Sequence, residues 1–312
     1  MRIFVAGATG AIGTPLVHAL VANGHDVTGM TRSPAKASGL RAAGAEAAIA
    51  DALDRDAVLA AVTAAQPEVI VHQLTGLGGL TSLRNFDRAF AVTNRLRTEG
   101  TEHLLAAARA AGARRIVAQS FAGWPAVRSG GPVKTEDDPF DPDPVPSMRG
   151  TLDAIKRCEA LVTGSAGIEG IALRYGGFYG PGTGVAPGGD QVEMVRKRRF
   201  PVVGDGTGVW SFIHIDDAVA ATVAAIEHGA PGVYNVTDDA PAPVREWLPA
   251  LAAAAGAPAP RRVPRWLGRL AAGDAVVAMM TTIRGAANGK AKRELGWAPA
   301  HPTWREGFAS LL

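Results

Sequence analysis

Short apolar runs and helical patterns alternate from the first residues of the chain. Residues 2–6 form an apolar run that ends at glycine, and after Gly13 apolar residues recur at helical spacing, at Leu16, Val17, Leu20 and Val21. The pair Asn23-Gly24 is typical of a helix end, and residues 25–30 have the composition of a second strand. The pattern therefore predicts one strand-helix-strand unit of about 30 residues.

The same alternation continues further along the chain. It predicts strands at 47–50, 69–72, 115–119 and 168–173, and helices at 54–65, 88–111 and 151–162. Strands and helices that alternate at this spacing form a parallel sheet with helices on both faces. We expect an α/β protein with a doubly wound parallel sheet of the Rossmann type.

Segments rich in proline and glycine divide this pattern. Residues 129–146 contain five prolines and five acidic residues, which favours an extended surface loop, and the glycines of 176–189 suit a flexible lid beside a ligand. Residues 178–210 and 241–312 are expected to form a smaller C-terminal substrate-binding lobe over the carboxyl edge of the sheet. Residues 1–177, together with 211–240, then form the nucleotide-binding domain.

Composition narrows the class of protein. Of the 312 residues, 47% are apolar and 20% are charged, so the chain can bury a sizeable core. A net charge of +3 is too small to indicate nucleic-acid binding, and the run 196–199 is interpreted as a solvated helix end. The single cysteine, Cys158, allows no intrachain disulfide and no metal cluster. With no signal peptide or membrane span recognised, we expect a cytoplasmic protein without metal.

Three glycines at a spacing of three follow the first strand and precede the first helix, in the segment Gly7-Ala8-Thr9-Gly10-Ala11-Ile12-Gly13. Glycine allows a tight turn and a close backbone approach to a pyrophosphate, and the helix N-terminus supplies free N–H groups. We therefore predict a dinucleotide site whose contacts include Gly7, Thr9, Gly10, Ala11, Ile12 and Gly13.

This glycine spacing resembles that of the short-chain dehydrogenase/reductases, and later motifs are similar to those of its extended and atypical members, the NAD-dependent epimerase/dehydratase-like proteins. The matching segments fall in the family's order over the whole chain: 51–53, 71–75, 173–182, 212–217 and 290–297. The resemblance implies that the cofactor contacts also include Asp51, Ala52, Leu53, Gln73, Leu74, Thr75, Lys156, Tyr175, Gly176 and Phe178.

The residues that end the second strand indicate which dinucleotide binds. An acidic residue there would bind the 2′-hydroxyl of NAD and repel the extra phosphate of NADP. The chain has Thr31-Arg32-Ser33 instead. Because the Arg32 guanidinium can pair with a phosphate and Ser33 can donate its hydroxyl, we predict NADP(H) in preference to NAD(H).

The family's catalytic tyrosine is missing. In the family a tyrosine acts as acid or base four residues before a lysine, but here Leu152 precedes Lys156, and the only tyrosines are Tyr175, Tyr179 and Tyr234. Ser120 matches the family's active-site serine. The catalytic residues expected from the resemblance are Ser120, Lys156 and Tyr179, with Lys156 a ribose contact, a proton donor or an ordinary surface lysine. His214 is interpreted as part of a helix cap.

Three functions follow from these features. The first is an NADPH-linked oxidoreductase that reduces a small or medium carbonyl compound, with Ser120 holding the oxygen. The alternatives are an NADP-binding redox sensor, suggested by the missing tyrosine, and an epimerase or dehydratase that retains its nucleotide. Phe121, Trp124, Phe178, Trp210 and Phe212 are candidates for an aromatic substrate pocket. A homodimer through residues 88–111 and 151–162 is expected from the family.

Overall fold

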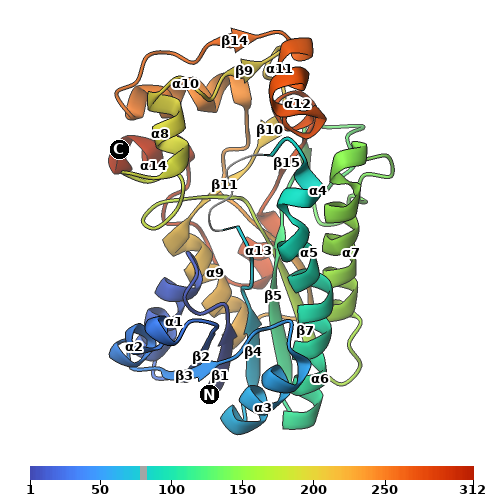
Figure 1. The fold of residues 1–312 in the computed structure, drawn as a ribbon, viewed down its shortest axis with the longest axis vertical. Coiled ribbons are helices and arrows are strands. Elements are labelled where there is room, and N and C mark those ends of the chain that lie inside the picture. Colours follow the sequence, from blue (N-terminus) through green and yellow to red (C-terminus); the bar gives the residue numbers. More distant parts are fainter. Residues whose placement is uncertain (78–82) are drawn as a thin grey trace.

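A seven-stranded parallel sheet organises the chain in the computed structural model, which describes residues 1–77 and 83–312 (Figure 1). Every strand pair in this sheet is parallel, and the order is β12-β7-β5-β4-β1-β2-β3. The strands are β1 Arg2–Ala6, β2 Asp26–Thr31, β3 Glu46–Ile49, β4 Val69–His72, β5 Arg115–Phe121, β7 Glu169–Tyr175 and β12 Gly232–Val236. The predicted doubly wound Rossmann sheet is confirmed.

Alternation along the strands sends side chains into two separate cores, because successive residues of a strand point to opposite faces. Ile3 and Val5 pack with Leu16 on one face, while Phe4 packs with Leu104 on the other. The first face is covered by α1 Gly13–Ala22 and α9 Ile215–Glu227. The second is covered by α3 Arg55–Ala65, α6 Thr101–Ala111 and α7 Arg149–Thr163.

The predicted helix 88–111 is not one continuous helix. The structure divides it into α4 Phe86–Ala89, α5 Ala91–Arg95, a π-helical segment η1 Leu96–Gly100, and α6. The Thr98 and Thr101 hydroxyls donate to carbonyls four residues earlier, at 3.0 and 2.7 Å. Such bonds compete with the regular backbone ladder, and Gly100 removes a side chain from the same turn. Hydrophobic spacing alone does not reveal this change of helix type.

Two further segments differ from the sequence-based expectation. Residues Pro34–Ala42 form the helix α2, which the pattern did not indicate because only Ala37 and Leu40 are buried on it. In the glycine-rich stretch, β8 Gly177–Tyr179 pairs with β11 Phe212–His214, and Val185 lies in a hydrophobic core. This stretch is therefore packed rather than a free lid over much of its length.

The C-terminal elements gather at the end of the molecule that lies beyond the carboxyl edge of the sheet (Figure 1). They surround an aromatic core that includes Trp247, Trp304 and Phe308. Residues 291–297 depart from the predicted lobe, since Ala291 and Trp297 join the core beside α1 and α9. The remaining elements are α8 Asp190–Arg196, α10 Val244–Ala254, α11 Arg265–Ala272, α12 Asp274–Thr281, α13 Gly289–Glu294, α14 Trp304–Leu311, 3-10 helix η2 Pro146–Met148, and the two-residue strands β6 Val133–Lys134, β9 Val202–Val203, β10 Val209–Trp210, β13 Ala242–Pro243, β14 Arg262–Val263 and β15 Gly285–Ala286.

Gly170 tests how tightly β7 packs on the end of α7. A Cβ at Gly170 would lie 1.9 Å from the Val162 carbonyl oxygen, whereas a Cβ at Gly39 on α2 would meet nothing within 4 Å. We expect Gly170→Ala to lower the free energy of unfolding by about 2 kcal/mol or more. Gly39→Ala, the matched control, should raise it by about 0.5–1 kcal/mol. Urea unfolding measures both, and equal effects of the two substitutions would contradict this packing.

Candidate functional site

The glycine turn has no room for side chains at its two ends. Gly7 has a φ of +89°, and a Cβ there would lie 2.6 Å from the Gln73 carbonyl oxygen. A Cβ at Gly13 would lie 2.0 Å from the Gly7 carbonyl oxygen. The turn is closed by the Gly10 amide, which donates to the Gly7 carbonyl at 3.1 Å. The start of α1 is thus brought against the ends of β1 and β4, which is the geometry that fits a pyrophosphate.

The ends of β2 and β3 carry the residues predicted to meet the adenosine. Arg32 is 68% exposed at its side chain, and its Nη1 lies 3.9 Å from Oδ2 of Asp51. The Ser33 amide donates to the Thr31 hydroxyl at 3.2 Å, and that hydroxyl also contacts the Thr9 hydroxyl. Arg32 is therefore only loosely paired and can turn toward an anionic ligand.

The segment after β3 is held more firmly. The Leu53 amide donates to Oδ1 of Asp51, and the Ala52 carbonyl bonds the ring of His103 at 2.9 Å. Ala52 is buried beneath this contact. The second carboxylate oxygen of Asp51, Oδ2, is the one that lies near Arg32.

Gln73 links the end of β4 to Tyr175. The Gln73 side-chain amide donates to the Tyr175 hydroxyl at 3.1 Å, and that hydroxyl also bonds Thr222 at 2.7 Å. Burial raises the pKa of Tyr175 to about 12. Tyr175 is therefore a buried structural tyrosine and a poor proton donor at neutral pH. Oε1 of Gln73 is buried without a partner among the described residues, which leaves an acceptor for a bound molecule.

The other residues after β4 and β7 have mixed surroundings. Leu74 donates its amide to His72, and Thr75 follows it in the half-exposed chain before the segment 78–82, which lies outside the described residues. Gly176 has no room for a Cβ, because the Ser211 carbonyl oxygen would lie 2.8 Å away. Phe178 stacks at a tilt on Tyr175, with ring centroids 5.3 Å apart.

Tyr179 lies in the aromatic core. It is fully buried and packs edge-on against Phe308 and His214, with centroids 5.4 and 5.1 Å away. Its hydroxyl has no hydrogen-bond partner among the described residues, and burial is the largest cause of its raised pKa. With no open space beside it for a substrate, we assign Tyr179 to packing rather than to catalysis.

Ser120 is engaged by a buried ion pair. Its hydroxyl donates to Oε1 of Glu159 at 2.5 Å, and Arg174 donates to both Glu159 oxygens at 2.8 and 2.7 Å. The Glu159 and Arg174 side chains are only 6% and 12% exposed. Because the Ser120 hydrogen is committed to a carboxylate, this serine is not free to hold a substrate oxygen in the observed arrangement.

Sequence reasoning gave no role to Glu159 or Arg174. A signal was present, because Glu159 follows Leu152 by seven residues, Ile155 by four, and precedes Val162 by three, which is the spacing of one buried helix face. An acidic residue on a buried face requires a positive partner or several hydrogen bonds. Arg174 provides the first and Ser120 contributes to the second.

Lys156 and Leu152 lie in different surroundings on α7. Lys156 is 38% exposed at its side chain, with its Nζ 3.9 Å from Asp153 and 5.8 Å from the centre of the Phe140 ring. Leu152 is fully buried in an apolar cluster with Phe86 and Trp124. The position where the family has its tyrosine is thus an apolar contact.

The proposed aromatic pocket is not one cluster. Phe121 and Trp124 belong with the Leu152 cluster, Phe212 lies in the C-terminal aromatic core, and Phe178 packs beside the sheet. Only Trp210 contacts two of these clusters. Of the five candidates, Phe121, Trp124 and Trp210 therefore share the cluster that contains Leu152 of α7.

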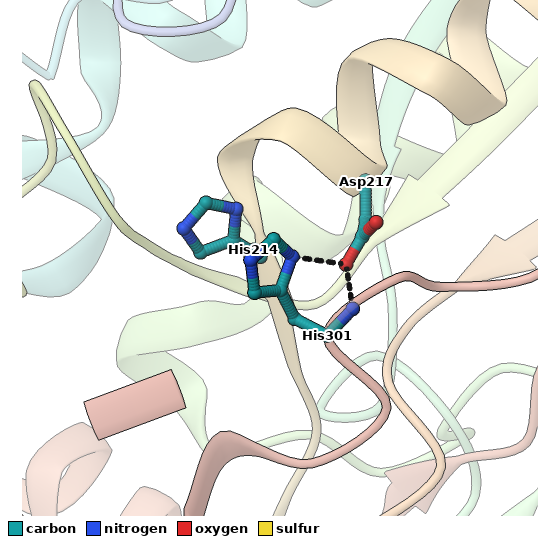
Figure 2. Close-up of side chains that lie close together, drawn as sticks. All are labelled: His214, Asp217 and His301. Carbon is teal, nitrogen blue, oxygen red and sulfur yellow. Dashed lines mark hydrogen bonds and ion pairs between the residues drawn. The ribbon is translucent and has the colours of Figure 1, made fainter. Parts of the chain in front are cut away.

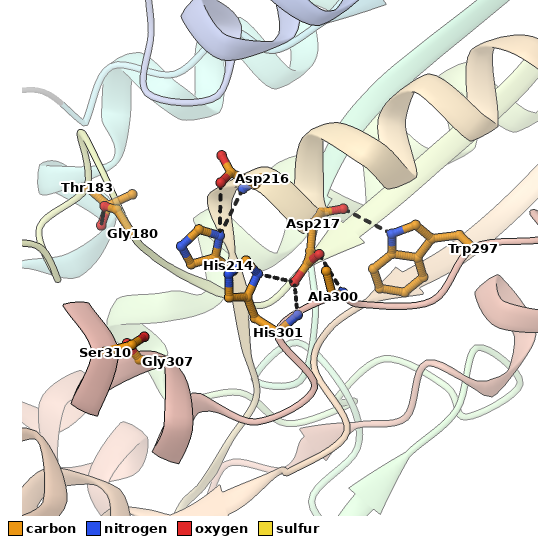
Figure 3. Close-up of polar contacts among 10 residues, drawn as sticks. All are labelled: Gly180, Thr183, His214, Asp216, Asp217, Trp297, Ala300, His301, Gly307 and Ser310. Carbon is orange, nitrogen blue, oxygen red and sulfur yellow. Dashed lines mark hydrogen bonds and ion pairs between the residues drawn. The ribbon is translucent and has the colours of Figure 1, made fainter.

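His214, Asp217 and His301 come together at the start of α9 (Figure 2). His214 caps the helix by accepting the Asp216 amide at 3.2 Å, as the sequence predicted (Figure 3). The Asp217 carboxylate accepts from the amides of Ala300 and His301 and from the His301 ring.

Their ligand atoms lie within 4.8 Å of one another, a spacing at which a metal ion is worth testing. However, the two imidazoles are stacked with centroids 3.8 Å apart, so their nitrogens do not converge on one point, and the carboxylate is already hydrogen-bonded. Trp297 adds a bond to the Asp217 carbonyl at 3.1 Å (Figure 3). We therefore describe the cluster as a structural tie between α9 and the chain that precedes α14.

Comparison of the sequence with known proteins identifies its family. The model of the NAD dependent epimerase/dehydratase family matches residues 3–237. The chain belongs to this family. It is 50% identical over 309 residues to the 3-diazoavenalumate denitrifying reductase of a Streptomyces species, a match that covers 99% of each chain. It is 30% identical to the 2-alkyl-3-oxoalkanoate reductase of Stenotrophomonas maltophilia, over 83% of this chain and 77% of the relative.

A solved structure gives the same fold. The UDP-glucose 4-epimerase of Thermus thermophilus, in complex with NAD, superposes with a TM-score of 0.75 at 24% identity, covering 100% of this chain and 97% of the other. This family member is an NAD(P)-dependent oxidoreductase. Within the described residues, we find no helix with the length and apolar character that crossing a bilayer requires.

A substitution at Glu159 tests how much the buried pair of Glu159 and Arg174 stabilises the fold. Glu159→Gln leaves Arg174 buried without its counter-ion, so we expect it to lower the free energy of unfolding by about 3 kcal/mol or more. The control is Glu102→Gln, since Glu102 pairs with Arg157 at 2.8 Å on the surface, where a pair contributes under about 1 kcal/mol. Urea unfolding separates the two, and a loss at Glu159 no larger than at Glu102 would show that the buried pair is not required.

Proposed function

We propose that this protein is an NADPH-linked reductase. The observation that carries the proposal is the glycine turn, whose cradle excludes a Cβ at Gly7 and Gly13, next to a loosely paired Arg32. In this proposal Arg32 and Ser33 bind the 2′-phosphate, and the remaining contacts are those of the predicted set: Thr9, Gly10, Ala11, Ile12, Asp51, Ala52, Leu53, Gln73, Leu74, Thr75, Lys156, Tyr175, Gly176 and Phe178. When bound, NADPH supplies a hydride.

The apolar Leu152 position favours an acceptor that needs a hydride but no proton. The Streptomyces relative is named for a diazo acid that it denitrifies by reduction. In a reductive loss of N2, the carbon that bears the diazonium group gains the hydride, and the electron pair of its C–N bond leaves with N2. Oxidation of NADPH to NADP⁺ would supply that hydride, and the step would balance without an acid because the diazonium group already carries the positive charge. We therefore propose an organic acid that carries a diazonium group as the first substrate class.

Carbonyl reduction is the second candidate. It is favoured by the Stenotrophomonas relative, which is named as an oxoalkanoate reductase. The alkoxide formed in such a reduction must take a proton, and Ser120 is committed to Glu159 while Tyr175 is buried. Lys156, which reaches solvent from α7, is then the candidate donor.

We also propose a cytoplasmic location and a homodimer through residues 88–111 and 151–162. The first is supported by the one free cysteine, Cys158, which is buried. The second rests on the family resemblance.

Removal of Arg32 tests the choice of cofactor. Arg32→Gln deletes the charge that would meet the 2′-phosphate, so we expect NADPH to bind about tenfold more weakly, with NADH binding changed by less than about twofold. Calorimetry with each nucleotide measures both. Arg41→Gln on the exposed side of α2 serves as the control, and equal losses for NADPH and NADH in Arg32→Gln would reject the NADP preference.

A substrate panel tests the acceptor. With NADPH carrying deuterium at the transferable position, a diazo acid should release N2 and incorporate deuterium at the carbon that carried the nitrogen, with one NADPH oxidised per N2. Ketones and 3-oxoacids should be inert. Turnover of ketones alone would favour the carbonyl reductase instead. No oxidation of bound NADPH by either class would contradict both substrate assignments.

A further inference from the structure

Arg97 is a buried arginine whose side chain makes no hydrogen bond within residues 1–77 and 83–312. It lies in the π-helical segment η1 and is only 4% exposed. Its Nε and Nη1 are enclosed and make no hydrogen bond among the described residues. The third nitrogen, Nη2, also makes no described hydrogen bond, but it is not enclosed to the same degree. Nη2 is therefore the nitrogen that an incoming ligand oxygen would meet first, and it shares a donor fork with each of the other two nitrogens.

Two side-chain contacts show which part of α7 lies opposite Arg97. Asn94 donates to the Thr151 hydroxyl at 3.0 Å, and the Thr101 hydroxyl lies 3.5 Å from the sulfur of Cys158. In both contacts the residue in α7 lies 57 positions after its partner in the chain. The two helical stretches therefore run in parallel, and Arg97 is level with the part of α7 between Leu152 and Lys156.

The neighbourhood of Arg97 carries an uncompensated positive charge. Arg97 interacts electrostatically with Glu159 and Cys158, but the Glu159 carboxylate is already paired with Arg174. Burial raises the pKa of the Cys158 thiol, so it adds no negative charge. His72 is neutral at pH 7, because burial lowers its pKa to about 4. Two guanidinium groups thus share one carboxylate.

The fold places this charge beside the ligand-binding edge. His72 ends β4, and its ring bonds the Thr101 hydroxyl, which in turn donates to the Arg97 carbonyl. Ser120, which bonds Glu159, is the penultimate residue of β5. In open α/β sheets, ligands bind outside the carboxyl ends of the strands. A guanidinium at that edge with no counter-ion of its own among the described residues has the chemistry to take an anionic oxygen.

We propose that Arg97 binds an anionic oxygen of the acceptor substrate, a carboxylate first of all, level with the position where the family has its tyrosine. The inference deepens the proposed reductase function and rests on it, because the bound acid is a substrate only if the protein is a reductase. Under this proposal, the substrate that accepts the hydride is an organic acid. Neutral ketones and sugars are then poor ligands, because they would leave the buried charge without a partner.

Ligand binding tests the proposal without any turnover. The protein is first saturated with NADP⁺, and calorimetry then compares cinnamate with cinnamamide, which has the same shape but no charge. We expect the wild-type protein to bind cinnamate about tenfold more tightly than the amide. Arg97→Gln should abolish this preference, and Arg97→Lys should keep part of it because it retains the charge but not the fork.

Arg95→Gln is the matched control, since Arg95 is an exposed neighbour paired with Glu99, and it should bind both probes as the wild type does. If Arg97→Gln does not fold, the wild type and Arg97→Lys still decide the question. No preference in the wild type, or an unchanged preference in a folded Arg97→Gln, would overturn the proposal. Failure of NADP⁺ to bind at the first step would instead count against the reductase function.

Discussion

The close approach of three backbone segments is the constraint on which the architecture depends. At Gly7 the chain turns against the carbonyl of Gln73, and at Gly13 the first helix begins against the carbonyl of Gly7. One added methyl group at either position would separate β1, β4 and α1. Since these elements lie at the centre of the sheet and of its first core, the turn that fits a pyrophosphate also sets the packing of the fold.

A second constraint is the buried carboxylate of Glu159. It holds Arg174 on β7 and Ser120 on β5 to α7, so it joins two adjacent strands to the helix where the family's catalytic residues lie. This arrangement uses the serine hydroxyl as a structural donor. Together with the apolar Leu152, it removes both groups that usually act on a carbonyl oxygen. What remains is the glycine turn that fits a dinucleotide, beside a serine and a leucine that cannot supply a proton to an acceptor.

The sequence predicted the fold better than the chemistry. Strand 69–72 and the ends of the first helix followed from apolar runs and glycine, because these signals act locally. The break at residues 96–100 did not, since it depends on how Thr98 and Thr101 bond to the backbone. The roles expected of Ser120 and Tyr179 came from family position alone. Their contacts with Glu159 and Phe308 join segments far apart in the chain, which no local pattern records.

The tie at Asp217 has a mechanical consequence. One side chain on α9 holds the amides of Ala300 and His301, and the aromatic core begins three residues later at Trp304. This tie is one of several to the sheet, because the Asn288 side chain donates to the Thr237 carbonyl and the Trp304 amide donates to the Asp238 carboxylate. Because these ties lie on both sides of the segment that leads into α14, the aromatic core is held to the sheet as one body rather than as a separate swinging domain.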